Sequence, residues 1–324
     1  MKGSIFLFIE NLRFSLNATV PVFLMMVFGY FSKKVGLLDD HTTAKLNKFV
    51  FRTLLPALLF MDLSTADFLA VWDGRLVLFC MAVTLICVGM ACLYSLLHKN
   101  KSERGEIIQA AYRSSAAILG IAFVKNIYGE ATMAALMIVG TVPLYNIIAV
   151  VTLSLTSPDR ANQKGGKELF KSTAKGIITN PIILGIIVGI FWSLLRIPQP
   201  VILQKSVSYL GNMATPLSLI ALGASFKAEE AKDKLKITTG IVFIKLVLFC
   251  ALFLPVAVHF GFRGEKLRAI LVMLGSATTG SCFVMAKNFG HEGNITALAV
   301  MMATLGSAFT LTGWLFVLKS LNYI

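Results

Sequence analysis

The chain has 324 residues, of which 56% are hydrophobic and only 14% are charged, and its mean hydropathy is +0.78. A soluble domain carries about 25% charged residues and cannot bury this much apolar surface, so the composition excludes a soluble globular protein and indicates a membrane protein. The formal net charge of +14 does not indicate nucleic-acid binding, because Lys and Arg lie mostly between apolar runs, where they fix membrane orientation.

Ten apolar segments, each of about 20 residues, follow one another along the chain, and each is long enough to cross a bilayer as a helix. We therefore expect an all-α polytopic membrane protein with short connections and no separate soluble domain. The first segment lacks the pattern of a cleavable signal peptide and is expected to remain as a span. The predicted spans cover residues 12–31, 46–63, 75–97, 107–127, 131–155, 174–195, 207–226, 237–260, 267–289 and 295–318.

A polar stretch rich in Gly and charged residues, at 157–168, separates the fifth span from the sixth. Landmarks on its two sides repeat at a constant offset: Pro21 and Pro181 are 160 residues apart, and so are Pro56 and Pro216. This spacing indicates an internal duplication. We predict a first five-helix repeat at 1–156, a cytoplasmic linker at 157–170 and a second five-helix repeat at 171–324.

An odd number of spans in each repeat means that the second repeat enters the membrane from the opposite side. The sequence thus predicts two inverted repeats, the architecture of many secondary transporters. Lys and Arg are more frequent in the loops that follow odd-numbered spans. The positive-inside rule places these loops in the cytoplasm and both termini on the extracytoplasmic side of the cell membrane.

Runs of small and hydroxyl-bearing residues occur within the fourth and ninth spans, at matching places in the two repeats. Transporter helices unwind in such runs and expose main-chain N–H groups and positive helix ends to an anion. Small residues also allow close helix packing in lipid, but the matched pair favours a site. The predicted substrate-binding residues in these runs are Arg113, Ser114, Ser115 and Ala116, together with Thr278, Thr279, Gly280 and Ser281.

Arg113 is the most informative single residue, because a charge at the centre of a span costs about 2.5–3.5 kcal/mol on insertion scales. It is either a fixed cation that attracts a carboxylate or a structural arginine that reaches water or a carbonyl. Tyr145 and Asn146 lie deep in the fifth span, and they either line the same cavity or join helices. Lys245 is a weaker candidate, because it lies nearer to the end of its span.

No catalytic constellation is present, and no metal or cofactor motif is found. The five cysteines all lie inside apolar runs without a CxxC pair, so they are expected to be buried thiols. The chain is therefore not expected to be an enzyme or to bind a cofactor. The only intramembrane carboxylate is Asp62, near the end of a span, which gives little support to a carboxylate proton relay.

Short motifs extend over the whole chain in a fixed order. They are Asn47-Lys-Phe-Val50 before Pro56, Leu119-Gly-Ile121 before Tyr128-Gly129, Asn180-Pro181 at the start of the sixth span, and Phe283-Val-Met-Ala-Lys287. In these motifs the chain resembles the auxin efflux carrier family, whose members include plant auxin exporters and bacterial carriers of malate- or malonate-like acids.

The resemblance implies a scaffold of spans 1, 2, 6 and 7 and a transport domain of spans 3–5 and 8–10. It also implies broken helices that cross in spans 4 and 9, an elevator-like motion and a homodimer. The crossover would fall at 114–117 and 278–281. This chain departs from the family there, because it has Ser114-Ser115-Ala116 where Asn is common, and Thr279-Gly280 where plant members have proline. Auxin itself is therefore not assumed as the substrate.

The sequence predicts a secondary carrier or uniporter of small carboxylates, with the bilayer as its surroundings and with proton or sodium coupling left open. A membrane-embedded receptor or regulator is an alternative, although no soluble output domain is present. A sodium-coupled symporter with the architecture of the bile-acid symporters is a second alternative. The sequence leaves open which acid is carried and in which direction.

Overall fold

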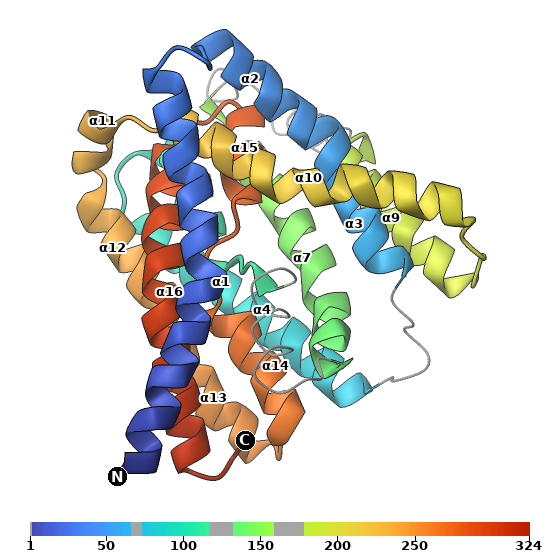
Figure 1. Ribbon diagram of the computed structural model, residues 1–324, viewed down its shortest axis with the longest axis vertical. Helices are drawn as coiled ribbons and strands as arrows, with labels where there is room; N and C mark the ends of the chain where they lie inside the picture. Colours follow the sequence, from blue (N-terminus) through green and yellow to red (C-terminus); the bar gives the residue numbers. More distant parts are fainter. Residues whose placement is uncertain (1, 66–72, 117–131, 159–177) are drawn as a thin grey trace.

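The computed structural model of the protein describes residues 2–65, 73–116, 132–158 and 178–324, and the regular structure in these ranges is helical (Figure 1). Six helices of the described residues are long and apolar enough to cross a membrane, which confirms an all-helical multi-pass membrane protein. They are α1 (Lys2–Lys34), α4 (Gly74–Leu96), α7 (Thr132–Thr156), α10 (Val201–Ser225), the continuous run of α12 (Leu235–Phe243), η5 (Ile244–Leu248) and α13 (Phe249–His259), and α16 (Asn294–Ser320).

The other four predicted spans overlap helices that are shorter or interrupted. The second consists of α2 (Asp40–Phe49), a π-helical turn η1 (Val50–Leu54) and α3 (Leu55–Ser64), and the sixth is α9 (Pro181–Leu194). The fourth begins with α5 (Arg104–Tyr112), and the ninth is divided into α14 (Gly264–Gly275) and α15 (Ser281–Asn288). Residues 117–127, the motifs at 119–121 and 128–129, and linker residues 159–170 lie outside the described residues.

Polar side chains just before the helices fix where several of them begin. Asn180 accepts a hydrogen bond from the N–H of Ile182 at 2.9 Å, and Pro181 takes the first position of α9, where a missing N–H has no cost. Asp73 caps α4 in the same way, through the N–H of Leu76 at 3.1 Å. The local sequence thus sets these boundaries before any tertiary contact forms.

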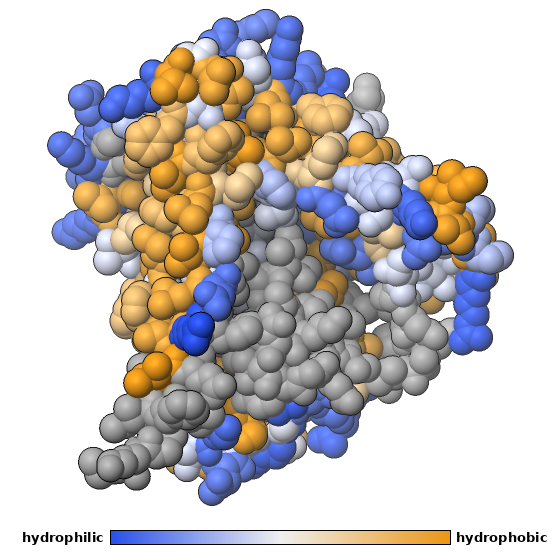
Figure 2. Space-filling model, in the orientation of Figure 1, coloured by the Kyte–Doolittle hydropathy of each residue, from blue (hydrophilic) through white to orange (hydrophobic). Residues whose placement is uncertain are grey.

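The helices α1 and α10 touch through their main chains. A Cβ atom added to Gly29 of α1 would lie 2.1 Å from the carbonyl oxygen of Ile220, and one added to Gly223 of α10 would lie 1.9 Å from that of Met26. Only glycine permits this approach. Large apolar side chains remain exposed on the outer faces of the helices, and Figure 2 shows them gathered over α1 and its neighbours, where lipid would cover them.

The interruptions of the fourth and ninth spans meet in the interior. The chain is extended just after α5 ends at Tyr112, and again between α14 and α15. The N–H of Ser115 donates to the carbonyl of Ala277 at 2.8 Å, and the hydroxyl of Thr278 donates to the carbonyl of Ala110 at 2.8 Å. The two extended segments therefore satisfy each other's main-chain groups, as unwound backbone in a membrane requires.

Candidate functional site

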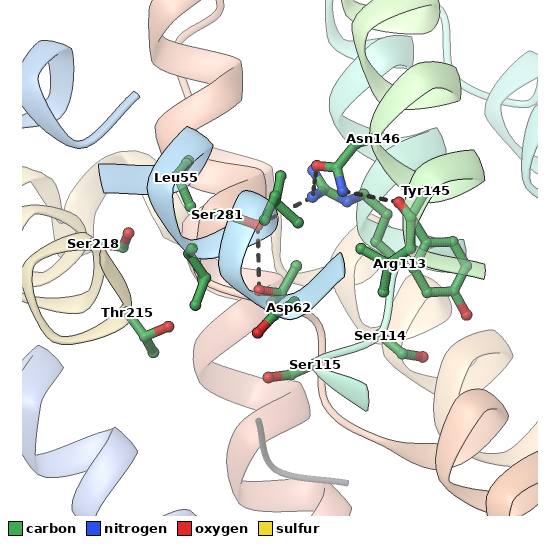
Figure 3. Close-up of a pocket in the computed structure, with 14 residues that line it drawn as sticks. Leu55, Asp62, Arg113, Ser114, Ser115, Tyr145, Asn146, Thr215, Ser218 and Ser281 are labelled. Atoms are coloured by element: carbon green, nitrogen blue, oxygen red, sulfur yellow. Dashed lines mark hydrogen bonds between the residues drawn. The ribbon is translucent and has the colours of Figure 1, made fainter. Parts of the chain in front are cut away.

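A pocket of about 60 Å³, which opens to solvent, lies at this crossing (Figure 3). One wall comes from two helices of the second and seventh spans, and the other comes from α7 and the two interruptions. The pocket is lined by Leu55, Leu58, Leu59 and Asp62 of α3; Thr215 and Ser218 of α10; Val142, Tyr145 and Asn146 of α7; and Arg113, Ser114, Ser115, Thr279 and Ser281 at the crossing.

Arg113 brings a buried positive charge to the pocket, since only 3% of its surface is exposed. One terminal nitrogen of its guanidinium donates to the amide oxygen of Asn146 at 3.0 Å and to the hydroxyl of Ser281 at 3.1 Å. The other contacts the sulfur of Met285 at 2.9 Å, and Nε has no hydrogen-bond partner. Among the described residues, no carboxylate pairs with this guanidinium within 4.0 Å. Arg113 is therefore a buried cation that lacks a counter-anion within the described part of the chain, which is a costly arrangement.

Asp62 lines the same pocket from the opposite wall, where Figure 3 shows it on α3. The side chain is half-buried, and no described residue gives its carboxylate a hydrogen bond or an ion pair. Sequence reasoning set Asp62 aside because it lies near the end of a predicted span. A signal was present in the helical spacing, because Asp62 lies one turn beyond Leu58 and Leu59 and so shares their face of the helix.

Lys245 lies in the π-helical turn η5 and is fully buried. Its ammonium donates to the carbonyl of Tyr112 at 3.3 Å, to the carbonyl of Leu274 at 3.1 Å and to the hydroxyl of Ser114. These carbonyls belong to the last turns of α5 and α14, where helices carry unpaired acceptors and partial negative charge. Lys245 thus holds the crossing together and does not face the pocket.

Seven of the ten predicted site residues line the pocket, namely Arg113, Ser114, Ser115, Tyr145, Asn146, Thr279 and Ser281. Thr278 and Gly280 line a smaller neighbouring cavity instead, and Ala116 is buried without lining either. The hydroxyl of Ser114 is already engaged, since it donates to the carbonyl of Met273 and accepts from Lys245. Most of the predicted substrate-binding residues thus line one pocket together with Arg113.

An ionic cluster lies outside the membrane-spanning helices, where the loop after α4 meets the loop before α12. Glu103 accepts from His98 at 2.6 Å and from Lys234 at 2.7 Å. Burial by itself raises the pKa of Glu103, but the hydrogen bonds and charges of Lys234 and His98 outweigh burial and lower that pKa below its usual value. The hydrogen bond that Lys234 donates to Glu103 raises the pKa of Lys234. Within the described residues, no group of His, Cys, Asp and Glu side chains has the arrangement of a metal site.

Comparison with known proteins identifies relatives that are all described as transporters or carriers. The sequence profile of a family described as membrane transport protein matches residues 14–315. An uncharacterized transporter of Escherichia coli strain K12 is 21% identical over 94% of this chain and 98% of its own length. A putative malonate transporter of Rhizobium meliloti is 21% identical over 93% of this chain and 95% of its own length. A probable auxin efflux carrier component of Oryza sativa is 28% identical over 47% of this chain and 43% of its own length.

Among solved structures, the sodium proton antiporter MjNhaP1 from Methanocaldococcus jannaschii has a similar fold. The TM-score is 0.60 at 11% sequence identity, over 96% of this chain and 98% of the antiporter chain. At this identity the likeness concerns the fold alone.

Proposed function

The chain belongs to the membrane transport protein family, which includes the auxin efflux carriers, and we propose that it carries small organic anions, in particular carboxylates, across the cell membrane. It is a membrane transporter and not an enzyme. In this proposal the protein is a secondary active transporter or a uniporter that works by an elevator-type alternating-access movement. The observation that carries the anion assignment is the buried guanidinium of Arg113, which has no counter-anion among the described residues.

A carboxylate in the pocket would supply the missing counter-charge. The guanidinium presents its donors in a fixed fork that matches a carboxylate, and its buried Nε has no hydrogen-bond partner among the described residues. Ser281 begins α15, so the positive end of that helix dipole lies at the same wall of the pocket. The malonate assignment of one relative agrees with this class of solute.

We further propose that the ten predicted spans form two inverted five-helix repeats, at 1–156 and 171–324. In this arrangement α1, α2–α3, α9 and α10 form a scaffold, and the remaining spans form a transport domain. Within the proposed scaffold α3 contacts α9 and α10, and within the proposed transport domain α4 contacts α5 and α7, while α1 packs against α16 across the division. The pocket lies between the two groups, with Asp62 on the scaffold side and Arg113 on the transport side. A solute bound there would move with Arg113.

Charge bias in the loops supports extracytoplasmic termini in this proposal, and family resemblance supports a homodimer. Ion coupling is part of the proposal, with protons or sodium as the candidates. Uptake measured in sodium-free and in sodium-containing buffers distinguishes these two ions.

The test is uptake of labelled malonate and of an indole acid into proteoliposomes under imposed pH and voltage gradients. Arg113→Gln is compared with wild type, and Arg75→Gln on the exposed face of α4 serves as the matched control. Loss of about 3 kcal/mol of charge-assisted hydrogen bonding predicts at least a roughly 100-fold fall in malonate uptake for Arg113→Gln. Size-exclusion profiles and Tm values establish that the variants are folded. Unchanged uptake would make Arg113 a structural residue, and no uptake of any acid by wild type would overturn the proposed function.

A further inference from the structure

The carboxyl group of Asp62 lines the pocket without a hydrogen-bond or ion-pair partner among the described residues. Asp62 and Arg113 both line the pocket, but they form no ion pair within 4.0 Å. An ionised carboxylate only accepts hydrogen bonds, and no described side chain or main-chain N–H donates to this one. A ligand that fills the pocket therefore meets a donor at one wall and an acceptor at the other.

The groups around Asp62 leave its charge without a neighbouring cation. Across the pocket from Asp62, the titratable lining residues are Arg113 and Tyr145. Helix α9, which packs against α3, carries no titratable residue between Pro181 and Leu194. On α10 and η1, which also pack against α3, the titratable side chains Lys205, Tyr209 and Arg52 are exposed at the surface. Among the described residues, the pocket thus holds one positive and one negative group at separate places.

We propose that the pocket recognises its solute at both ends, with a carboxylate against Arg113 and a hydrogen-bond donor against Asp62, so that a dicarboxylic acid binds as its singly protonated monoanion. This inference rests on the proposed function. A fully ionised diacid would satisfy Arg113 but would place its second carboxylate against another carboxylate, where two negative charges repel. With one proton, the distal carboxyl of the solute donates to Asp62, and the two carboxyl groups share that proton.

The transported species then carries one negative charge and one proton. No change of protonation within Arg113 is needed, because a guanidinium stays charged. The pocket also selects among small acids: a monoacid without a donor leaves Asp62 unsatisfied, and an acid with a carboxamide at its far end satisfies both walls without any proton.

The experiment compares malonate with its monoamide, malonamate, which has one carboxylate and one carboxamide. Initial uptake rates into proteoliposomes are measured from about pH 7.5 to about pH 5.5, with equal pH on both sides and no voltage, for wild type and Asp62→Asn. Asp233→Asn, in the exposed loop before α12, is the matched control. For wild type, malonate uptake should rise at least about fivefold across this range, because acid favours the singly protonated form, while malonamate uptake should change less than about twofold.

In Asp62→Asn the side-chain amide donates to a carboxylate, so doubly ionised malonate is accepted and the rise on acidification should fall below about twofold. Equal pH profiles for wild type and Asp62→Asn, or an equal rise for malonamate, would overturn the role of Asp62 while leaving the carrier function in place. Uptake of neither acid by wild type would instead overturn the carrier function. A thermal-shift titration of wild type with both acids at both pH values repeats the test without a variant, and malonate should stabilise more strongly at the lower pH.

Discussion

Lys245 donates its ammonium to the main-chain carbonyl of Leu274 at 3.1 Å, one residue before α14 ends. The same ammonium donates at 3.3 Å to the carbonyl of Tyr112, where α5 ends. Two interrupted helices would otherwise bring two partial negative charges together in the interior. The buried ammonium of Lys245 contacts both helix ends, so its positive charge compensates their partial negative charges.

Lys245→Met is expected to destabilise the crossing. It retains most of the side-chain volume but leaves the carbonyls of Tyr112 and Leu274 without this donor, at a cost of about 1–3 kcal/mol for each buried group. We expect a lower Tm in detergent and a loss of uptake. Lys236→Met, on an exposed face of α12, is the matched control and should leave both unchanged. A Lys245→Met protein with the Tm of wild type would show that the ammonium does not stabilise the crossing.

The close contact between α1 and α10 predicts that a larger side chain at this contact will destabilise the protein. Gly223→Ala would place a Cβ atom 1.9 Å from the carbonyl oxygen of Met26, so the two helices must separate. We expect a destabilisation of about 1–3 kcal/mol, as for other overpacked sites. Gly89→Ala, where nothing lies within 4 Å, should be neutral or stabilising by up to about 1 kcal/mol because alanine favours helices. The Tm values of the two variants, measured by thermal unfolding, test this prediction. Equal Tm values for Gly223→Ala and Gly89→Ala would contradict the packing argument.

The sequence allowed much of the helical framework and the place of the crossing to be predicted. Apolar length alone located the six long spans that the described residues contain, and the paired runs of small residues, around Ser115 and Thr278, marked where the helices are interrupted. Both signals can be found in a single sequence. The length of an apolar segment reflects the thickness of the bilayer, and a run of small residues reflects where a helix can unwind. The inverted repeats and the substrate role of these residues remain predictions.

The composition of the pocket was harder to predict, because it depends on which helices meet. Asp62 lies near the end of its span by hydropathy, yet α3 brings it against the crossing from the other group of helices. Lys245 likewise lies toward the end of its predicted span, and only the contact with α5 and α14 shows what it binds. A single sequence reports the period of a helix but not its neighbour, so these two charges could not be assigned in advance.

The pKa of Glu103 yields a prediction of pH dependence. Because the pKa is lowered in the folded protein from 4.5, the cluster with Lys234 and His98 stabilises the fold above about pH 4.5 and loses this effect as the pH falls through the folded pKa. Glu103→Gln should therefore lower the stability by about 1–2 kcal/mol near pH 7, and the difference from wild type should shrink below about pH 4.5. Tm values measured in detergent across this range test it, with Glu229→Gln on exposed α11 (Ala228–Lys232) as the control. A difference that is constant with pH would contradict the assignment.

Asn146→Asp tests whether the pocket depends on an uncompensated guanidinium. Asn146 accepts from Arg113 at 3.0 Å through its amide oxygen, and its own amide donates to the carbonyl of Val142 at 2.9 Å. Aspartate has nearly the same shape, and its carboxylate would lie where it can pair with Arg113. The variant loses the hydrogen bond to Val142 but gains an ion pair with Arg113, so it should fold while carrying a built-in counter-anion that competes with the solute.

Malonate uptake by Asn146→Asp should fall about 10- to 100-fold, corresponding to a lost attraction of about 1.4–2.8 kcal/mol at the guanidinium. Asn322→Asp, in the exposed turn after α16, adds the same charge away from the pocket and should transport normally. Combining Asn146→Asp with Arg113→Gln should cause little further loss, because each change removes the same free positive charge. Normal uptake by folded Asn146→Asp would mean that the solute does not bind at Arg113, whereas a loss of uptake equal to that of Asn322→Asp would point to a general effect of added negative charge.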